Sequence, residues 1–282
     1  MEKVQMPSQD LMALVRQGPV VAPGAFDAFS AKMVAEAGFS VVYVGSYGTA
    51  ASAGMADVGL LTLDELVAHA KKVVQAVDVP VVADAEGGFY EPANLWRTVH
   101  AFEDAGVRAI HIEDHAGGKH ADVPQRLIPL EEMLAKLRAA MDARRDPTFR
   151  IIARTDAIWA VGDQSEARRR LDAFAELGVD MVFPTGASIE FVQSIRRVGM
   201  PPVVVIQTPD SDPFAKAGGA DLMLYYGFCL YAAAKGMKNA LSAFKQTLDT
   251  TQVGSLLEDV EEFESRFGYA DFSARAKHYG AK

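Results

Sequence analysis

The chain has only one cysteine, fewer basic than acidic residues and no long apolar run. Its one cysteine, Cys229, excludes an internal disulfide and a zinc site built from several cysteines. The net charge of −9 argues against nucleic acid or an anionic membrane as a partner. No run of about 18 apolar residues predicts a membrane-spanning helix, and no secretory signal is visible at the N-terminus. We therefore expect a cytoplasmic protein.

The sequence does contain eight short apolar runs that alternate with helical patterns. The expected strands are residues 19–24, 41–46, 80–86, 109–114, 150–157, 180–185, 201–208 and 221–227. Near-continuous apolar strands are typical of a parallel sheet that is covered on both faces. Eight such units predict an α/β fold, a (β/α)8 TIM barrel. An open doubly wound sheet is the alternative, but the chain has no GxGxxG fingerprint.

The pattern changes after residue 228, where a long helix rich in alanine begins. We expect a barrel catalytic domain over residues 1–240 and a C-terminal helical extension over residues 241–282. The extension exceeds what closure of the barrel requires. It is expected to pack on a neighbouring subunit, or as a cap on the same chain.

One strand, in the stretch "VVADAEGGFY", ends with two carboxylates, Asp84 and Glu86. Residues two apart on a strand point to the same face, so these side chains should converge. Two buried carboxylates repel each other unless a cation lies between them. Because carboxylate oxygens are the preferred ligands of hard cations, this end of the strand suggests Mg²⁺ or Mn²⁺.

Other predicted strands also end in ionisable residues. They lie at the same end of the predicted barrel, where the catalytic groups of this fold are found. Glu113 and Asp114 end the fourth run, and Arg154 and Asp156 end the fifth. The second run ends in "GSYG", which offers backbone N–H groups for an anion. Two loops add further candidates: Asp57 after the second run, and Lys119 and His120 in residues 115–126, "HAGGKHADVPQR". We expect this last loop to be a mobile lid with glycine hinges at Gly117 and Gly118.

Five motifs together resemble the isocitrate lyase/phosphoenolpyruvate mutase superfamily, and its methylisocitrate lyase-like members most closely. They are "VVYVGSYGTAAS", "ADVGLLTLDE", "VVADAEGGFY", "HIEDHAGGKH" and "IIARTDA", and the order and spacing match over roughly residues 18–240.

The resemblance implies a barrel whose last helix is exchanged between subunits, usually in a homotetramer that is a dimer of dimers. It implies Mg²⁺ held by Asp84, Glu86 and Glu113. It implies a small carboxylate substrate bound by Ser46, Tyr47, Gly48 and Arg154, with Asp84 also beside it and Asp57 near the gating loop. The implied reaction makes or breaks a C–C or P–C bond next to a 2-oxo acid, through a pyruvate-like enolate.

The chain departs from the lyases of this superfamily in the loop that carries their catalytic cysteine. Residues 115–126 contain no cysteine. Lys119, His120, Tyr47 or a metal-bound water must then deliver the proton. We expect a Mg²⁺-dependent C–C lyase for a small 2-hydroxy- or 2-oxo-dicarboxylate, by retro-aldol cleavage or by decarboxylation of an oxaloacetate type. The alternatives are a phosphonomutase or phosphonopyruvate hydrolase, and a catalytically silent barrel that binds a carboxylate.

Overall fold

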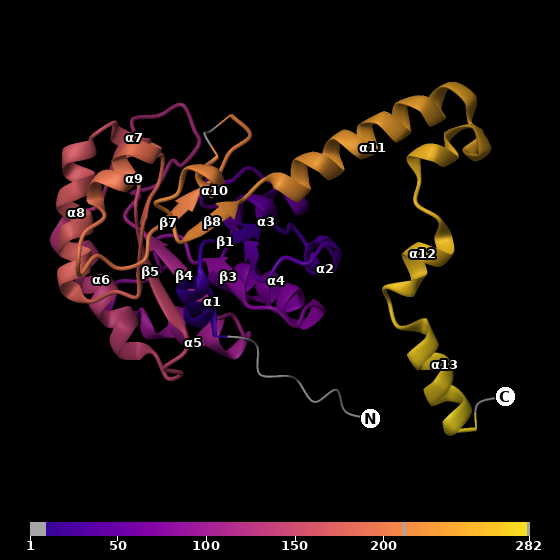
Figure 1. Cartoon of the computed structure of the whole chain (residues 1–282), viewed down its shortest axis with the longest axis horizontal. Helices are drawn as coiled ribbons and strands as arrows, with labels where there is room; N and C mark the ends of the chain where they lie inside the picture. The colour runs from indigo at the N-terminus through magenta and orange to yellow at the C-terminus, as the bar shows by residue number, and fades with distance from the viewer. Residues whose placement is uncertain (1–9, 211–212, 281–282) are drawn as a thin grey trace. The chain divides into compact units, whose positions relative to one another are not determined.

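The computed structural model describes residues 10–210 and 213–280, and the chain divides into two compact units between Leu230 and Tyr231. The first unit contains eight strands, and the second contains the last helices (Figure 1). The domain boundary expected at residue 240 stays a prediction.

The strands of the first unit pair in parallel, as predicted. They are β1 (Val20–Pro23), β2 (Val42–Val44), β3 (Val81–Asp84), β4 (Ala109–Glu113), β5 (Arg150–Thr155), β6 (Met181–Pro184), β7 (Val204–Ile206) and β8 (Leu222–Tyr225). Five form a sheet in the order β2-β3-β4-β5-β6, and three form a sheet in the order β1-β8-β7. The register sets Asp84 opposite His111, and Glu113 opposite Arg154.

The two sheets meet at two narrow joints. Gly24, just after β1, forms an isolated parallel bridge with Tyr43 of β2, and Val182 of β6 forms another with Val203. The backbone N–H of Ala25 donates to the Tyr43 carbonyl at 2.8 Å, and that of Val182 donates to the Pro202 carbonyl at 3.0 Å. Through these two bridges the eight strands follow one another in a ring, and the predicted α/β fold with parallel strands is confirmed.

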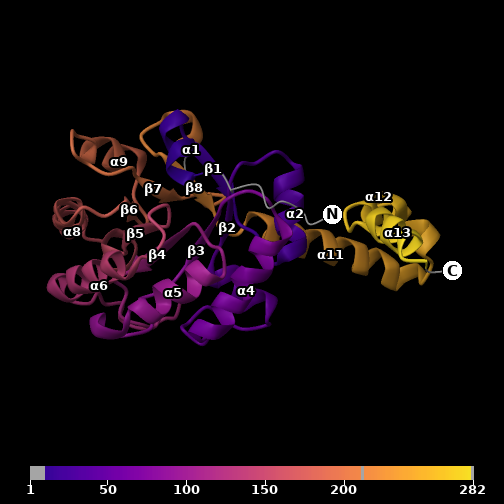
Figure 2. The same cartoon turned by 90° about the horizontal axis from the view of Figure 1, so that it is seen from below.

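Helices cover the outside of this ring, as Figure 2 shows for α4, α5, α6 and α8 beside the five-stranded sheet. The helices between strands are α2 (Ala28–Glu36), α3 (Ser46–Ser52), α4 (Leu63–Ala76), α5 (Trp96–Asp104, preceded by a 3₁₀ turn at Pro92–Asn94), α6 (Leu130–Ala143), α7 (Ala157–Val161), α8 (Gln164–Leu177), α9 (Ile189–Ile195) and α10 (Phe214–Ala217). α4 shows how the local sequence specifies such a helix. Thr62 and Glu65 form a capping box at its start, and Leu66, Ala70 and Val73 bury one face.

The apolar core has two layers. Large side chains such as Phe102, Phe149 and Phe174 are fully buried in the layer that lies around the strands, where each contributes roughly 1.5–3 kcal/mol by leaving water. An inner layer contains Val82, Ile152 and other inward-facing strand residues. Leu11 and Val15 of α1 (Leu11–Gln17) pack against this inner layer. The barrel interior is thus a filled core, and its chemistry is confined to the strand ends.

The last part of the chain is helical. α11 (Phe228–Thr247) begins in the first unit, and a 3₁₀ segment (Thr250–Leu256), α12 (Val260–Ser265) and α13 (Tyr269–His278) follow. None of the α11 side chains is buried. Among the described residues, no helix combines the length and apolar character needed to span a membrane.

Candidate active site

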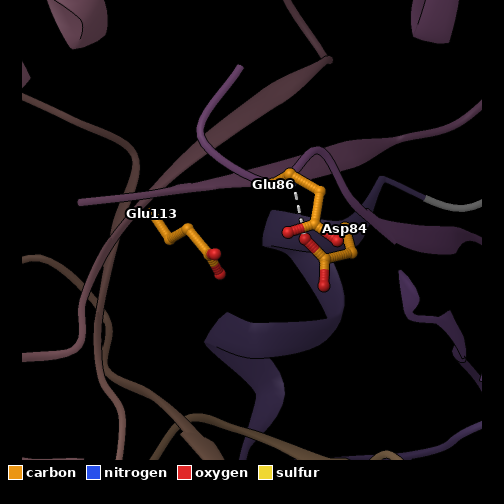
Figure 3. A group of neighbouring side chains, drawn as sticks. All are labelled: Asp84, Glu86 and Glu113. Carbon is orange, nitrogen blue, oxygen red and sulfur yellow. Dashed lines mark hydrogen bonds between the residues drawn. The ribbon is translucent and has the colours of Figure 1, made fainter. Parts of the chain in front are cut away.

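Three carboxylates meet at the ends of two adjacent strands, as predicted. Asp84 is the last residue of β3, Glu113 is the last residue of β4, and Glu86 lies two residues beyond Asp84. Each offers an oxygen within 4.8 Å of the others. Figure 3 shows the three carboxyl groups facing a common region. We call Asp84, Glu86 and Glu113 the carboxylate triad.

The convergence of Asp84 and Glu86 does not come from strand alternation, which corrects the sequence argument. β3 ends at Asp84, two residues earlier than predicted, and Glu86 adopts a left-handed φ of 49° in the following turn. The Glu86 backbone N–H donates to Oδ1 of Asp84 at 2.8 Å, which stabilises this turn. A tight turn with an uncommon backbone conformation therefore brings the second carboxylate to the first.

The carboxylate triad receives a positive charge from the 115–126 loop. Lys119 Nζ lies 2.8 Å from Oε2 of Glu86 and 3.0 Å from Oε1 of Glu113, and its side chain is only 5% exposed. Burial acts to lower the pKa of Lys119, but Glu113 and Asp84 outweigh it and raise that pKa well above its usual value. Lys119 therefore stays protonated. Its ammonium group lies among the three carboxylates that the resemblance predicts to be metal ligands.

Arg154 is fixed by acidic neighbours on both sides. Its Nε and Nη2 donate to the two carboxylate oxygens of Asp156 at 2.7 and 3.0 Å, and its Nη1 lies 2.9 Å from Oε2 of Glu113. Asp156 is oriented in turn, because its backbone N–H donates to Oδ1 of buried Asp114 at 2.9 Å. Arg170 of α8 pairs with the other Asp114 oxygen at 3.0 Å. The guanidinium is thus a preorganised fork that points at the strand ends.

His111 is a site residue that the sequence argument missed. Its Nε2 lies 3.0 Å from the Tyr43 hydroxyl, and its Nδ1 faces Oδ1 of Asp84 at 3.5 Å. Burial lowers the pKa of His111 to about 4, so the ring is neutral near pH 7. His111 Nδ1 makes no hydrogen bond of its own, so the ring lies beside Asp84 without fixing it. Ser46 Oγ donates to Oδ2 of Asp84 at 3.0 Å and the Glu86 backbone N–H donates to Oδ1, so each Asp84 oxygen accepts a hydrogen bond.

The 115–126 loop is folded around Gln125. The Gln125 amide nitrogen donates to the carbonyls of Gly118, Ala121 and Val123, and its Oε1 lies 2.7 Å from Nε2 of His115. Gly117 and Gly118 have positive φ, and His120 also has a φ of 63°. This conformation places Lys119 inward, over the carboxylate triad. The mobility predicted for this loop stays a prediction.

His120 joins the same loop to Asp57. Its Nε2 lies 3.4 Å from Oδ2 of Asp57, and its ring contacts the rings of Tyr47 and Trp159 at centroid distances of 5.7 and 5.1 Å. The structure therefore brings Asp57, Tyr47, Lys119 and His120 to one pocket, and their roles in proton transfer stay a prediction.

These groups line one pocket of about 140 Å³. Ser46 and Tyr47 line it from the first turn of α3, whereas the sequence predicted that Ser46 ends the second strand. Gly48 belongs to the same turn but is not among the lining residues. The lining residues that were not predicted as site residues are Tyr43 of β2 and a second group from later in the chain: Trp159, Thr185, Gly186, Ile206, Thr208 and Tyr226. The residues of the second group all follow or end strands β5–β8, and this position was the signal available in the sequence.

The electrostatics of the carboxylate triad suit a bound cation. Burial raises the pKa of Glu113 to about 8 against the influence of Arg154 and Lys119. Burial and the nearby Asp84 also raise the pKa of Glu86. At Asp84 burial acts upward, but His111, Lys119 and Arg154 outweigh it and hold that pKa below its usual range. Two of the three ligands thus gain from additional positive charge, and an all-oxygen donor set fits a hard divalent ion.

Comparison with known proteins decides the family. The phosphoenolpyruvate phosphomutase family matches residues 11–245. The chain belongs to this family. It therefore lies within the isocitrate lyase/phosphoenolpyruvate mutase superfamily, as the motifs predicted.

Its relatives within the superfamily include lyases. The chain is 37% identical to a 2,3-dimethylmalate lyase from Eubacterium barkeri over 88% of this chain and 89% of that one. It is 31% identical to a 2-methylisocitrate lyase from Aeropyrum pernix over 97% and 91%. A crystal structure of phosphonopyruvate hydrolase in complex with oxalate and Mg²⁺ superposes with a TM-score of 0.87 at 26% identity, over 96% and 98%. The chain is thus an enzyme-family member whose relatives include C–C lyases and a P–C bond enzyme.

Proposed function

We propose that this protein is a Mg²⁺-dependent C–C lyase for a small 2-hydroxy- or 2-oxo-dicarboxylate, acting through a pyruvate-like enolate. The observation that carries the proposal is the carboxylate triad beside Arg154, with Lys119 over it; Asp84, Lys119 and Arg154 of this group line one small pocket, and Glu86 and Glu113 lie behind the lining. Relatives named dimethylmalate lyase and methylisocitrate lyase support the reaction class. A relative solved with oxalate and Mg²⁺ supports the ion and a two-carboxylate ligand.

In this proposal, Asp84, Glu86 and Glu113 hold the divalent ion. The ion, when bound, would supply the positive charge at which an enolate oxygen is stabilised. Arg154 lines the pocket and orients the substrate carboxylate, because its guanidinium is held in place by Asp156. Ser46, Tyr47 and Gly48 complete the carboxylate site with the first turn of α3.

Proton transfer is assigned to the 115–126 loop and its contacts. A retro-aldol cleavage needs a base for the 2-hydroxyl group and an acid for the leaving carbanion, whereas a decarboxylation needs only the acid. We assign the base to His120, which faces Asp57, and the acid to protonated Lys119. Tyr47, whose ring contacts His120, is the further candidate. Closure of the loop excludes water from the enolate.

Assembly as a homotetramer that exchanges α11 is part of the proposal. Met237 and Leu241 of α11 are 58% and 67% exposed, although both are large apolar residues. A second subunit would cover such residues. A cytoplasmic location is likewise an expectation from the sequence.

A P–C bond enzyme is the second candidate, and the close superposition on phosphonopyruvate hydrolase favours it. A catalytically silent carboxylate-binding barrel is the third. One assay separates them. The protein is incubated with a panel of 2-hydroxy- and 2-oxo-dicarboxylates and with phosphonopyruvate, with and without EDTA, and 2-oxo acid and phosphate are measured. We expect 2-oxo acid from a dicarboxylate, lost in EDTA and restored by Mg²⁺ or Mn²⁺. Phosphate release supports the second candidate, and no release with any compound supports the third.

A further inference from the structure

The pocket has a charged half and an uncharged half. Its charged lining residues come from the segment between β2 and β5: Asp57, Asp84, Lys119, His120 and Arg154. Its lining residues on or just after β6, β7 and β8 are all uncharged: Thr185, Gly186, Ile206, Thr208 and Tyr226. Because the strands follow one another round the ring, these two sets occupy different arcs of the pocket wall. We call the second set, together with Trp159, the neutral wall.

Trp159 joins the neutral wall to the 115–126 loop. Its ring lies 5.5 Å from the His115 ring and 5.1 Å from the His120 ring. Its backbone and Cβ pack against Gly186, where an added Cβ would lie 3.1 Å from the Trp159 Cβ. Trp159 therefore lies between the loop, which its ring contacts, and the turn after β6, which its backbone and Cβ contact, and the residue is 37% exposed.

A carboxylate at the neutral wall would have no cationic partner. Among the described residues that line the pocket, the basic side chains are Lys119, His120 and Arg154, and all three lie in the charged arc. Each already faces an acidic group there: Glu86, Asp57 and Asp156, respectively. The hydroxyl groups of Thr185, Thr208 and Tyr226 can donate to a carboxylate but supply no positive charge to offset its burial. Burying an alkyl group against Trp159 and Ile206 is favourable.

We infer that the neutral wall binds an alkyl substituent of the substrate, so the preferred substrate is an alkyl-substituted four-carbon dicarboxylate and not a tricarboxylate. The inference rests on the proposed function for the position of the two carboxylates, which the charged arc would hold. The wall's preference for an alkyl group is a binding property, so it is measurable without turnover.

Trp159 provides the probe. The chain has two tryptophans, and Trp96 lies on α5, outside the pocket lining. Trp96→Phe leaves Trp159 as the sole tryptophan. Malate, 3-methylmalate, 3-isobutylmalate and isocitrate are then titrated with Mg²⁺ present, by calorimetry and by Trp159 emission. Isocitrate is the carboxymethyl counterpart of 3-isobutylmalate, with similar shape and one more charge.

We expect 3-methylmalate to bind about tenfold or more tightly than malate, because a methylene in an apolar pocket is worth roughly 10–200-fold. 3-Isobutylmalate should bind more tightly than isocitrate, and both alkyl compounds should change Trp159 emission. Thr208→Arg should reverse the isobutylmalate/isocitrate preference, and Thr208→Val should keep it. Tighter binding of malate than of 3-methylmalate, or of isocitrate than of 3-isobutylmalate, overturns the inference. Calorimetric binding of the alkyl compounds without any change in Trp159 emission also overturns it.

The same compounds separate this inference from the proposed function. If the alkyl compounds bind more tightly but no dicarboxylate releases a 2-oxo acid, the inference about the neutral wall holds and the lyase proposal is wrong. If isocitrate is cleaved faster than the alkyl compounds, the lyase proposal holds and the inference about the neutral wall is wrong.

Discussion

The ammonium group of Lys119 lies 2.8 Å from Oε2 of Glu86, and this contact joins the 115–126 loop to the turn after β3. The loop is therefore closed over the carboxylate triad by a buried ion pair. A metal ion bound between the same carboxylates would compete with the ammonium group for their oxygens. Metal binding and the position of this loop are thus linked.

Lys119→Met should tighten Mg²⁺ binding in the absence of substrate. Each charge-assisted contact is worth about 1.5–3 kcal/mol, and about 1.4 kcal/mol is a factor of ten, so we expect about a tenfold lower Kd. The same variant should lower kcat far more than it raises KM, because a proton donor acts in the transition state. Calorimetry and steady-state kinetics measure the two effects.

His120→Ala is the matched control: it should lower kcat but leave Mg²⁺ affinity unchanged, since His120 faces Asp57. Unchanged Mg²⁺ affinity in Lys119→Met would contradict the competition.

Asp84→Ala should abolish Mg²⁺-dependent activity while the fold is retained. Asp84 is the ligand whose pKa is held below the usual range, so it remains ionised at any working pH. We expect a loss of about 10³-fold or more, similar to that of other groups that stabilise developing charge. Activity across a Mg²⁺ titration and circular dichroism measure the two parts. Asp142→Ala, an exposed change on α6, is the control. Full activity of Asp84→Ala, or of the wild type in excess EDTA, would remove the metal from the proposal.

His111 should make the metal-free protein less stable as the pH falls from about 6.5 to about 4. Its pKa is lowered in the folded state, so the unfolded chain binds more protons in this window, and the free energy of unfolding decreases with decreasing pH. The contribution present above pH 6.5 is about 3 kcal/mol. Urea unfolding in EDTA at pH 7 and pH 4.5 compares the wild type with His111→Gln. The variant should show the smaller loss. An equal loss in both proteins would mean that His111 titrates normally.

Leu241→Glu should break a homotetramer into smaller species. A charge placed on an apolar face that a second subunit covers is buried without a partner. We expect the wild type to be a tetramer by light scattering at micromolar concentration and the variant to be smaller. Lys245→Glu, at the polar end of α11, is a charge-reversing control expected to remain a tetramer. A monomeric wild type would contradict the assembly.

The sequence predicted the eight strands and the meeting of Asp84, Glu86, Glu113 and Arg154 well. The reason is physical: parallel strands that are buried on both faces need uninterrupted apolar residues, and their carboxyl ends lie at one edge. Polar residues that close such runs are therefore brought together by topology, even though the turn at Glu86 was not foreseen.

Residues that the sequence did not identify depend on contacts between distant segments. His111 sits inside the run "AIHIE", where only its unusual polarity marked it, and its role needs Tyr43 and Asp84 from other strands. Trp159 belongs to α7, for which the sequence predicted no helix, and its position depends on Gly186 and His120. The α3 helix was missed although "TAAS" is rich in alanine.

The two narrow joints in the ring of strands have a mechanical consequence. Asp84, Glu113 and Arg154 all belong to the continuous sheet β2-β3-β4-β5-β6, whereas Ile206 and Tyr225 belong to the sheet β1-β8-β7. A single bridge links the sheets at each joint, Gly24 to Tyr43 and Val182 to Val203. Backbone pairing is therefore sparsest at these seams. The spacing of the three charged groups is set by the registers of one continuous sheet, whereas the position of Ile206 relative to them depends on packing across the seams. A substitution that alters packing at a seam should thus change how well the pocket fits a substrate before it disturbs the charged groups.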